Sequence, residues 1–177
     1  MERIVRKYRK ALLLAGLLLT TACSKSADRQ PGTPPGLDGL VMYGQSDMAW
    51  VLEHVTVFRT RTDLVSVPEE TVTYLRDLAK PVTILVFMGT WCEDAQRHVP
   101  VLFRALREAA NPRIVVRVIA LDRSKRDRDG LVERYQVAFS PTFVLEHQGL
   151  ELGRVIETPQ QDAASDIVAI LRSTLPR

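Results

Sequence analysis

The strongest constraint on the fold is a pair of continuous apolar runs, Val82–Met88 and Ile114–Leu121. Runs of this length with apolar residues on both faces are typical of strands buried inside a sheet. Between the two runs, four apolar residues recur at the three- and four-residue spacing of a helix: Val99, Leu102, Phe103 and Leu106. Two buried strands separated by an amphipathic helix predict an α/β domain.

Flanking patterns extend this prediction. Before the first strand, Pro68 and two acids favour the first turn of a helix whose apolar positions run from Val72 to Ala79. After the second strand we expect a helix, a hairpin of two strands that turns at Gln148-Gly149, and a closing helix. Their predicted ranges are 130–135, 142–147, 151–156 and 160–175. Nearer the N-terminus, 47–54 predicts a short helix, and the β-branched and aromatic content of 55–61 predicts a strand. The order predicts a central mixed β-sheet flanked by helices.

The net charge of +3 over 177 residues would suggest a nucleic-acid partner if the cations were spread over the domain. They are not, because residues 1–22 contain five of the 24 basic residues and one of the 21 acidic residues. The remaining chain has 19 basic and 20 acidic residues, which leaves it nearly neutral. The run 122–129 mixes cations with three acids and predicts a solvated loop. We therefore expect no nucleic-acid binding.

The basic residues of 1–22 precede a short apolar run and then Cys23, the layout of an export signal. A small residue before a cysteine at this point resembles the lipobox of bacterial lipoproteins, which implies that Cys23 carries the lipid anchor. Ordinary cleavage near Ala22 and an uncleaved anchor remain alternatives. Residues 23–40, rich in Pro and Gly, then predict a flexible linker, and 41–177 the folded domain. The resemblance implies a protein of the bacterial cell envelope, bound to the membrane through lipid only, at the outer membrane facing the periplasm.

Several residues of the domain resemble the thioredoxin family. Trp91-Cys92 lies between a buried strand and a helix, as the first half of that family's Trp-Cys-x-x-Cys motif does. Further matches are Pro100 in the helix, Ser140-Pro141-Thr142 before a strand, and Gly149 and Gly153 in the hairpin. The resemblance implies a thioredoxin-like fold, a cis-proline at Pro141, a catalytic Cys92, and a substrate surface formed by Trp91, Ser140, Pro141 and Thr142.

The motif is incomplete, because Ala95 stands where the family has its second cysteine, and Val86 stands where thioredoxin has a buried acid. If Cys23 is lipidated, Cys92 is the single thiol and forms no intramolecular disulfide. A thiolate at a helix N-terminus is stabilised by the helix dipole, whereas Glu93 and Asp94 beside it work the other way. The sequence leaves that balance open. The predicted chemistry is a mixed disulfide with a protein or small-thiol disulfide substrate, released by an external thiol.

A non-catalytic binding module, which would present the groove between Trp91 and Pro141 to a peptide, is the alternative function. We expect no cofactor and no metal site, because the sequence has no cluster of Cys and His at ligand spacing. His98, six residues after Cys92, is expected to be an exposed helix residue. Trp50 is expected in the core, Trp91 partly exposed, and Asp94 at the cap of the helix.

Overall fold

The computed structural model describes residues 36–38 and 41–175. The strands are β1 Gly36–Asp38, β2 Val41–Ser46, β3 Val82–Met88, β4 Ile114–Ala120, β5 Thr142–His147 and β6 Leu150–Ile156. The helices are α1 Met48–His54, α2 Thr56–Leu64, α3 Glu69–Asp77, α4 Glu93–Ala109, α5 Leu131–Arg134 and α6 Ala163–Thr174. The predicted α/β fold with a mixed sheet is confirmed.

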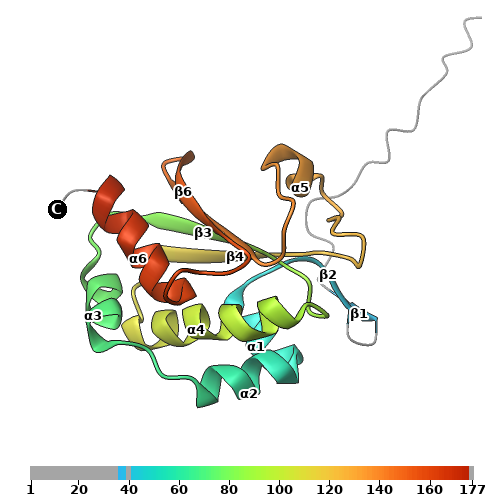
Figure 1. Cartoon of the computed structure of the whole chain (residues 1–177), viewed down its shortest axis with the longest axis horizontal. Helices are drawn as coiled ribbons and strands as arrows, with labels where there is room; N and C mark the ends of the chain where they lie inside the picture. Colours follow the sequence, from blue (N-terminus) through green and yellow to red (C-terminus); the bar gives the residue numbers. More distant parts are fainter. Residues whose placement is uncertain (1–35, 39–40, 176–177) are drawn as a thin grey trace, which may run out of the picture. The chain divides into compact units, whose positions relative to one another are not determined.

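The sheet has the strand order β1-β2-β4-β3-β5-β6. Strands β3 and β4 are parallel and joined through α4, whereas every other neighbouring pair is antiparallel. The two parallel strands lie at the centre, which explains why their sequences are mostly apolar, although the first half of β4, with Arg117, is partly exposed. Since β3 leads into α4, the start of that helix lies at the carboxyl end of β3 (Figure 1).

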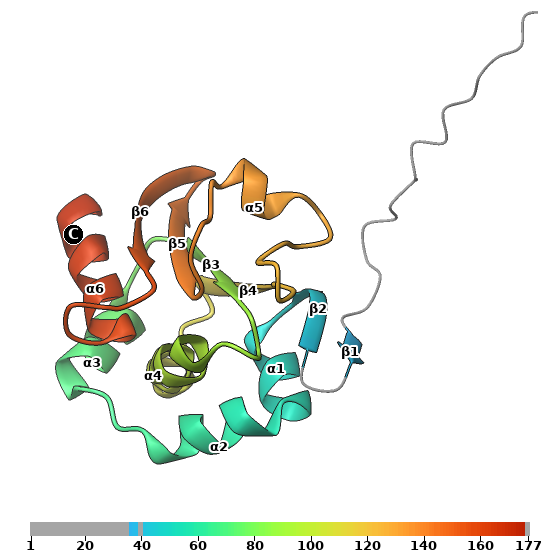
Figure 2. The same ribbon diagram turned by 45° about the vertical axis from the view of Figure 1, so that its right-hand side comes forward.

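Side chains of β3 alternate between two apolar clusters, one on each face of the sheet. Ile84, Val86 and Met88 belong to the large core formed with α1, α2, α3, α4 and α6. Leu85 and Phe87 belong to a smaller cluster with residues of α5 and the loop after it. Figures 1 and 2 agree that α5 lies across the sheet from α4. The sheet is therefore covered on both faces.

One element was predicted with the wrong structure. Residues 55–61 were expected to form a strand, but they lie at the start of α2 and in the residue before it. The buried residues Val55, Phe58 and Thr62 follow one another at helical spacing, and this face packs on α4. Burial along a helical stripe outweighs the weak strand preference of β-branched residues.

The first two strands were not predicted as strands. Gly36–Asp38, within the expected linker, pairs with β2, and β2 in turn pairs with β4. The remainder of the predicted linker, the signal segment and Cys23 lie outside the described residues. No helix of the described part of the chain is long and apolar enough to cross a membrane.

Candidate functional site

Cys92 lies at the junction between β3 and α4. After β3 ends at Met88 the chain turns, and the Cys92 N–H donates to the Gly89 carbonyl at 3.0 Å. Cys92 is then the N-cap of α4, and its own carbonyl accepts from the Gln96 N–H at 3.0 Å. The residue is partly exposed. The fold therefore holds this thiol at the N-terminus of a 17-residue helix, where the helix dipole favours negative charge.

The residues before β5 face this thiol. The Ser140–Pro141 peptide bond is cis, as the motif predicted, and the Cys92 Sγ donates to the Ser140 carbonyl oxygen at 3.1 Å. Two further hydrogen bonds fix this loop: the Gly89 N–H donates to Ser140 Oγ at 3.0 Å, and the Glu157 N–H donates to the Pro141 carbonyl at 2.7 Å. The cis-proline loop is thus tied to the end of β3 and to the residue after β6.

Thr142, also expected to bind substrate, is buried, as Ser140 and Pro141 are. Its Oγ1 donates to the Phe139 carbonyl at 2.8 Å. This hydrogen bond closes the backbone around Pro141. Thr142 therefore supports the shape of the loop, while Ser140 and Pro141 form the part next to the thiol.

Trp91 is partly exposed, as expected. Its indole ring is fixed by a hydrogen bond on one side and by close packing on the other. Its indole Nε1 donates to the Leu121 carbonyl at 3.1 Å, just beyond the end of β4. On the other side its ring lies against Gly89, with so little space that a Cβ there would come within 2.5 Å of the ring. The structure therefore brings Trp91, Cys92, Ser140 and Pro141 together at one end of the sheet.

The first turn of α4 contains the acids and the alanine of the motif. Glu93 is exposed, and Asp94 accepts from Arg97 Nη1 at 3.2 Å. Asp94 therefore pairs along the helix, and the cap of α4 has no side-chain hydrogen bond. Ala95 is completely buried in the core beneath the thiol. The position of the family's second cysteine is thus closed by packing as well as lacking sulfur.

His98 differs from its prediction as an exposed residue. It is partly buried, and its Nε2 is buried without a hydrogen-bond partner in the described structure. Burial lowers the pKa of His98 below its ordinary value, and Arg97 lowers it further, whereas Asp94 acts in the opposite direction. Within the described ranges, no group of three or more His, Cys, Asp and Glu side chains is placed to hold a metal ion.

The second tryptophan also lies nearer the surface than expected. Trp50 is partly buried against the main core and stacks on the His54 ring, with 4.3 Å between ring centroids.

Closer to Cys92, the structure shows one feature that the sequence did not predict. The loop 122–129 places Arg123 over the Trp91 ring and Lys125 over the ring of Phe139, which precedes the cis-proline loop. Sequence proximity gives no signal of such pairs, because their aromatic partners lie on other elements.

Comparisons with known proteins support the fold. A family model described as Thioredoxin matches residues 53–169. A crystal structure of a protein of unknown function from Pseudomonas aeruginosa is similar, with a TM-score of 0.57 and 22% identity over 72% of this chain and 92% of that chain. An HIV epitope scaffold is similar to the same degree, with a TM-score of 0.57 and 22% identity over 72% of this chain and 93% of its own. At this identity the two structures support the fold alone. No curated protein matches the chain with significant similarity.

Proposed function

Because the chain belongs to the thioredoxin family, we propose that it performs thiol–disulfide exchange with the single thiol of Cys92. The substrates would be disulfides of envelope proteins or of low-molecular-weight thiols. One observation carries the proposal: the partly exposed Cys92 Sγ lies at the N-terminus of α4, 3.1 Å from the Ser140 carbonyl and beside cis-Pro141. A helix N-terminus supports a thiolate, and partial exposure gives a disulfide access to it.

The reaction begins with the Cys92 thiolate attacking one sulfur of the substrate disulfide. A Cys92–substrate disulfide forms, the substrate's S–S bond breaks, and the second sulfur leaves with the bonding electron pair as a thiolate. The Ser140 carbonyl, which accepts from the neutral thiol, has no hydrogen to offer the thiolate. Loss of the proton therefore releases Sγ from this contact and frees it for attack.

Release of the mixed disulfide requires a thiol from outside. In a dithiol site a second cysteine one helical turn further would attack the Cys92 sulfur, but this position is the buried Ala95. One external thiol attacks the Cys92 sulfur and releases the reduced substrate, and a second regenerates the Cys92 thiolate. The two external thiols are thereby oxidised to a disulfide, which balances the reduction of the substrate.

The test follows the adduct by intact mass spectrometry under non-reducing conditions. The full chain carries Cys23→Ser, so that Cys92 is the single thiol, and reacts with a short peptide whose cysteine is activated as a thiopyridyl disulfide. We expect one peptide per chain, stable until glutathione is added, and no adduct in Cys92→Ser. A Cys92 that reacts no faster than free cysteine would contradict the proposal.

A second pair of variants tests the role of position 95. Ala95→Cys introduces a thiol three residues along the helix, where side chains of a helix neighbour one another. It should release the bound peptide without glutathione, through an internal disulfide with Cys92. Ala95→Ser is the matched control, since it adds an atom of similar size at the same buried site but no thiol. Equal release from the two variants would exclude Ala95 as the reason for single-thiol behaviour.

The rival function, a peptide-binding module, is favoured by the three hydrogen bonds that tie the cis-proline loop without using the thiol. They join Gly89 to Ser140, Thr142 to Phe139 and Glu157 to Pro141. A module of this kind would bind a peptide equally well with Cys92→Ser. Equal affinities together with an unreactive Cys92 would favour the binding module over exchange.

We propose in addition that residues 1–22 are an export signal and that Cys23 is lipidated, which would place the domain at the outer membrane facing the periplasm. The support is the order of cations, apolar run and cysteine in the sequence. Mass spectrometry of the chain extracted from bacterial membranes tests this. An N-terminus at Cys23 with acyl chains is expected, and an unmodified cysteine would exclude the lipid anchor.

A further inference from the structure

The loop 122–129 between β4 and α5 carries four cations, and three of them lie over aromatic rings. The pairs, by distance to the ring centroid, are Arg123 over Trp91 at 5.9 Å, Lys125 over Phe139 at 5.3 Å and Arg128 over Tyr43 at 4.3 Å. All three distances fall within the range of cation–π attraction, about 6 Å. One short loop therefore places its cations on aromatic side chains from three separate parts of the chain.

The acids of the same loop have a different role, because they accept hydrogen bonds from the protein itself. Asp122 accepts from two backbone N–H groups, Asp127 from three, and Asp129 from the side chain of Gln45. These contacts fix the loop backbone and occupy the carboxylates. Arg123 and Lys125 are exposed, as Asp122 and Asp129 are, and Lys125 Nζ also donates to the Ala138 carbonyl at 3.4 Å. What distinguishes the two cations is their place over the rings of Trp91 and Phe139, whereas the acids are directed to the loop backbone and to Gln45.

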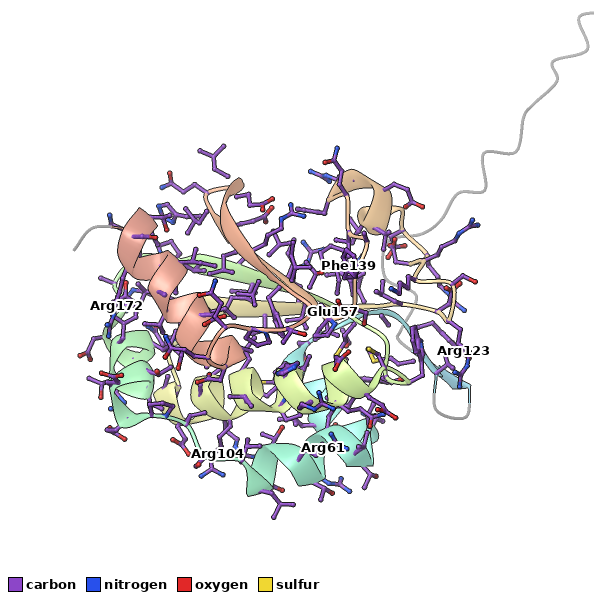
Figure 3. All side chains as sticks on the ribbon, in the orientation of Figure 1. Arg61, Arg104, Arg123, Phe139, Glu157 and Arg172 are labelled. Carbon is purple, nitrogen blue, oxygen red and sulfur yellow. The ribbon has the colours of Figure 1, made fainter. Side chains whose placement is uncertain are left out.

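Two of the three pairs border the thiol. Trp91 precedes Cys92, and its indole is bonded to Leu121 directly before the loop. Phe139 precedes the Ser140–Pro141 bond and is 46% exposed. Figure 3 shows Arg123 and Phe139 in the half of the molecule that holds α5, and Arg172 at the opposite end. A chain bonded to Cys92 and crossing the exposed faces of Trp91 and Phe139 therefore meets these cations.

We propose that Arg123 and Lys125, with the rings of Trp91 and Phe139, form a cationic rim that selects acidic peptide segments, in which Asp or Glu flank the disulfide-bonded cysteine. The proposal rests on the exchange chemistry of Cys92. A guanidinium matches a carboxylate in geometry, and a cation held against a ring has less freedom to lose on binding. The rings add apolar contact for the substrate's side chains.

The number of cation–aromatic pairs on the loop favours a peptide over a small thiol. Besides the two pairs of the rim, the loop places Arg128 over Tyr43 on β2, which offers a longer substrate a third contact of the same kind. The opposing charge is on α4, where Asp94 is paired with Arg97 and Glu93 is exposed. Glu93 follows Cys92 in the chain, and Glu157, which is partly exposed, follows β6 beside Pro141. Both rim cations are instead on loop 122–129, so a peptide that lies along this loop meets positive charge.

The experiment measures exchange rates at Cys92 with three short thiopyridyl-activated peptides, whose flanking residues are all Glu, all Gln or all Lys. Rates are divided by those of the same peptides with mercaptoethanol, which removes their intrinsic differences in reactivity. The protein is the full chain with Cys23→Ser. We expect the acidic peptide to react about fivefold faster than the neutral one at low salt, and less than about twofold faster in ~0.5 M salt.

Two double variants with the same charge change locate the effect. Arg123→Gln with Lys125→Gln should bring the acidic-to-neutral ratio to about one. Arg61→Gln with Arg172→Gln should keep it, because Arg61 is on α2 and Arg172 lies over Tyr74 at 5.0 Å, away from the rim in Figure 3.

A wild-type ratio of one or less overturns the rim, and so does a ratio that the rim variant leaves unchanged. If Cys92 instead reacts faster with oxidised glutathione than with the acidic peptide, and the rim variant loses this preference, the rim selects a small disulfide and the proposal of a peptide substrate is overturned. Failure of the proposed exchange chemistry gives a different result from failure of the rim. In that case no peptide, whatever its charge, reacts faster with Cys92 than with mercaptoethanol.

Discussion

Replacement of Gly89 by alanine tests how the end of β3 holds the site. The backbone of Gly89 is not left-handed, so alanine meets no backbone strain there. The obstacle is Trp91, because the new Cβ would lie 2.5 Å from its Cε2 and 2.6 Å from its Nε1. Carbon atoms pack at about 3.5–4.0 Å, so the indole must move by about 1 Å.

Two effects of moving the indole set the size of the loss in stability. A shift of this size breaks the 3.1 Å hydrogen bond from Trp91 to the Leu121 carbonyl, which contributes about 1 kcal/mol. Crowding of a packed position costs a further ~1–3 kcal/mol. We expect Gly89→Ala to lower the free energy of unfolding by about 2–4 kcal/mol. With a denaturant slope of about 2 kcal/mol/M, the urea midpoint falls by about 1–2 M.

The assay is urea unfolding followed by circular dichroism, with Trp91 emission recorded in a Trp50→Phe background. Gly149→Ala is the control, because its Cβ meets no atom within 4 Å and its cost comes from a φ of +79° alone, about 1–2 kcal/mol. Both variants should lose stability, but only Gly89→Ala should change the emission of Trp91. A loss below about 0.5 kcal/mol with unchanged emission would refute the reasoning.

Three further predictions concern single residues. Asn111→Ala should lower the free energy of unfolding by about 2 kcal/mol in urea titration, because its Nδ2 donates to the Leu75 and Leu78 carbonyls at 2.8 and 2.9 Å. Asp162→Ala should cost about 1 kcal/mol in thermal unfolding, because its carboxylate caps α6; Asp162→Asn should keep most of that stability. The lowered pKa of His98 means that the unfolded chain takes up a proton below about pH 6.5 that the folded chain does not, so stability falls as the pH decreases. His98→Leu should reduce this loss between pH 7.5 and 5.5, and an unchanged pH profile would contradict it.

The sequence predicted the centre of the sheet more accurately than its edge. Strand β3 begins and ends where its apolar run does, because burial of nearly every residue leaves a continuous hydrophobic signal. Strand β4 begins where the second run does and ends one residue before it. Strands β1 and β2 give no such signal, since β1 has three residues and β2 has one buried residue. Their pairing depends on β4, which lies far along the chain. Strands on this side of the sheet are specified by the strands with which they pair.

The site shows the same division between local and distant signals. Short motifs predicted three features of the site: the position of Cys92 at the start of a helix, the cis bond before Pro141, and the partial exposure of Trp91. These features depend on residues that are close in the sequence. His98 was misjudged because its environment is made by other elements packed on α4. Loop 122–129 is exposed, as predicted, but sequence spacing does not show which ring a guanidinium will cover. Pairings between distant segments are therefore the part that required the structure.

Under the proposed exchange, the buried Ala95 would also determine from which side the mixed disulfide is resolved. A second cysteine would attack the Cys92 sulfur from within α4, but the core fills that side. The external thiol would therefore approach from the exposed side, where Trp91 and the cationic rim lie. A rim that selects acidic substrates would attract anionic thiols by the same charges, which couples the two half-reactions. Glutathione should then release a bound neutral peptide faster than the uncharged mercaptoethanol does, after correction for their intrinsic reactivities. This advantage of glutathione should disappear in the variant that lacks Arg123 and Lys125. If it persists there, the rim does not attract the thiol that resolves the mixed disulfide.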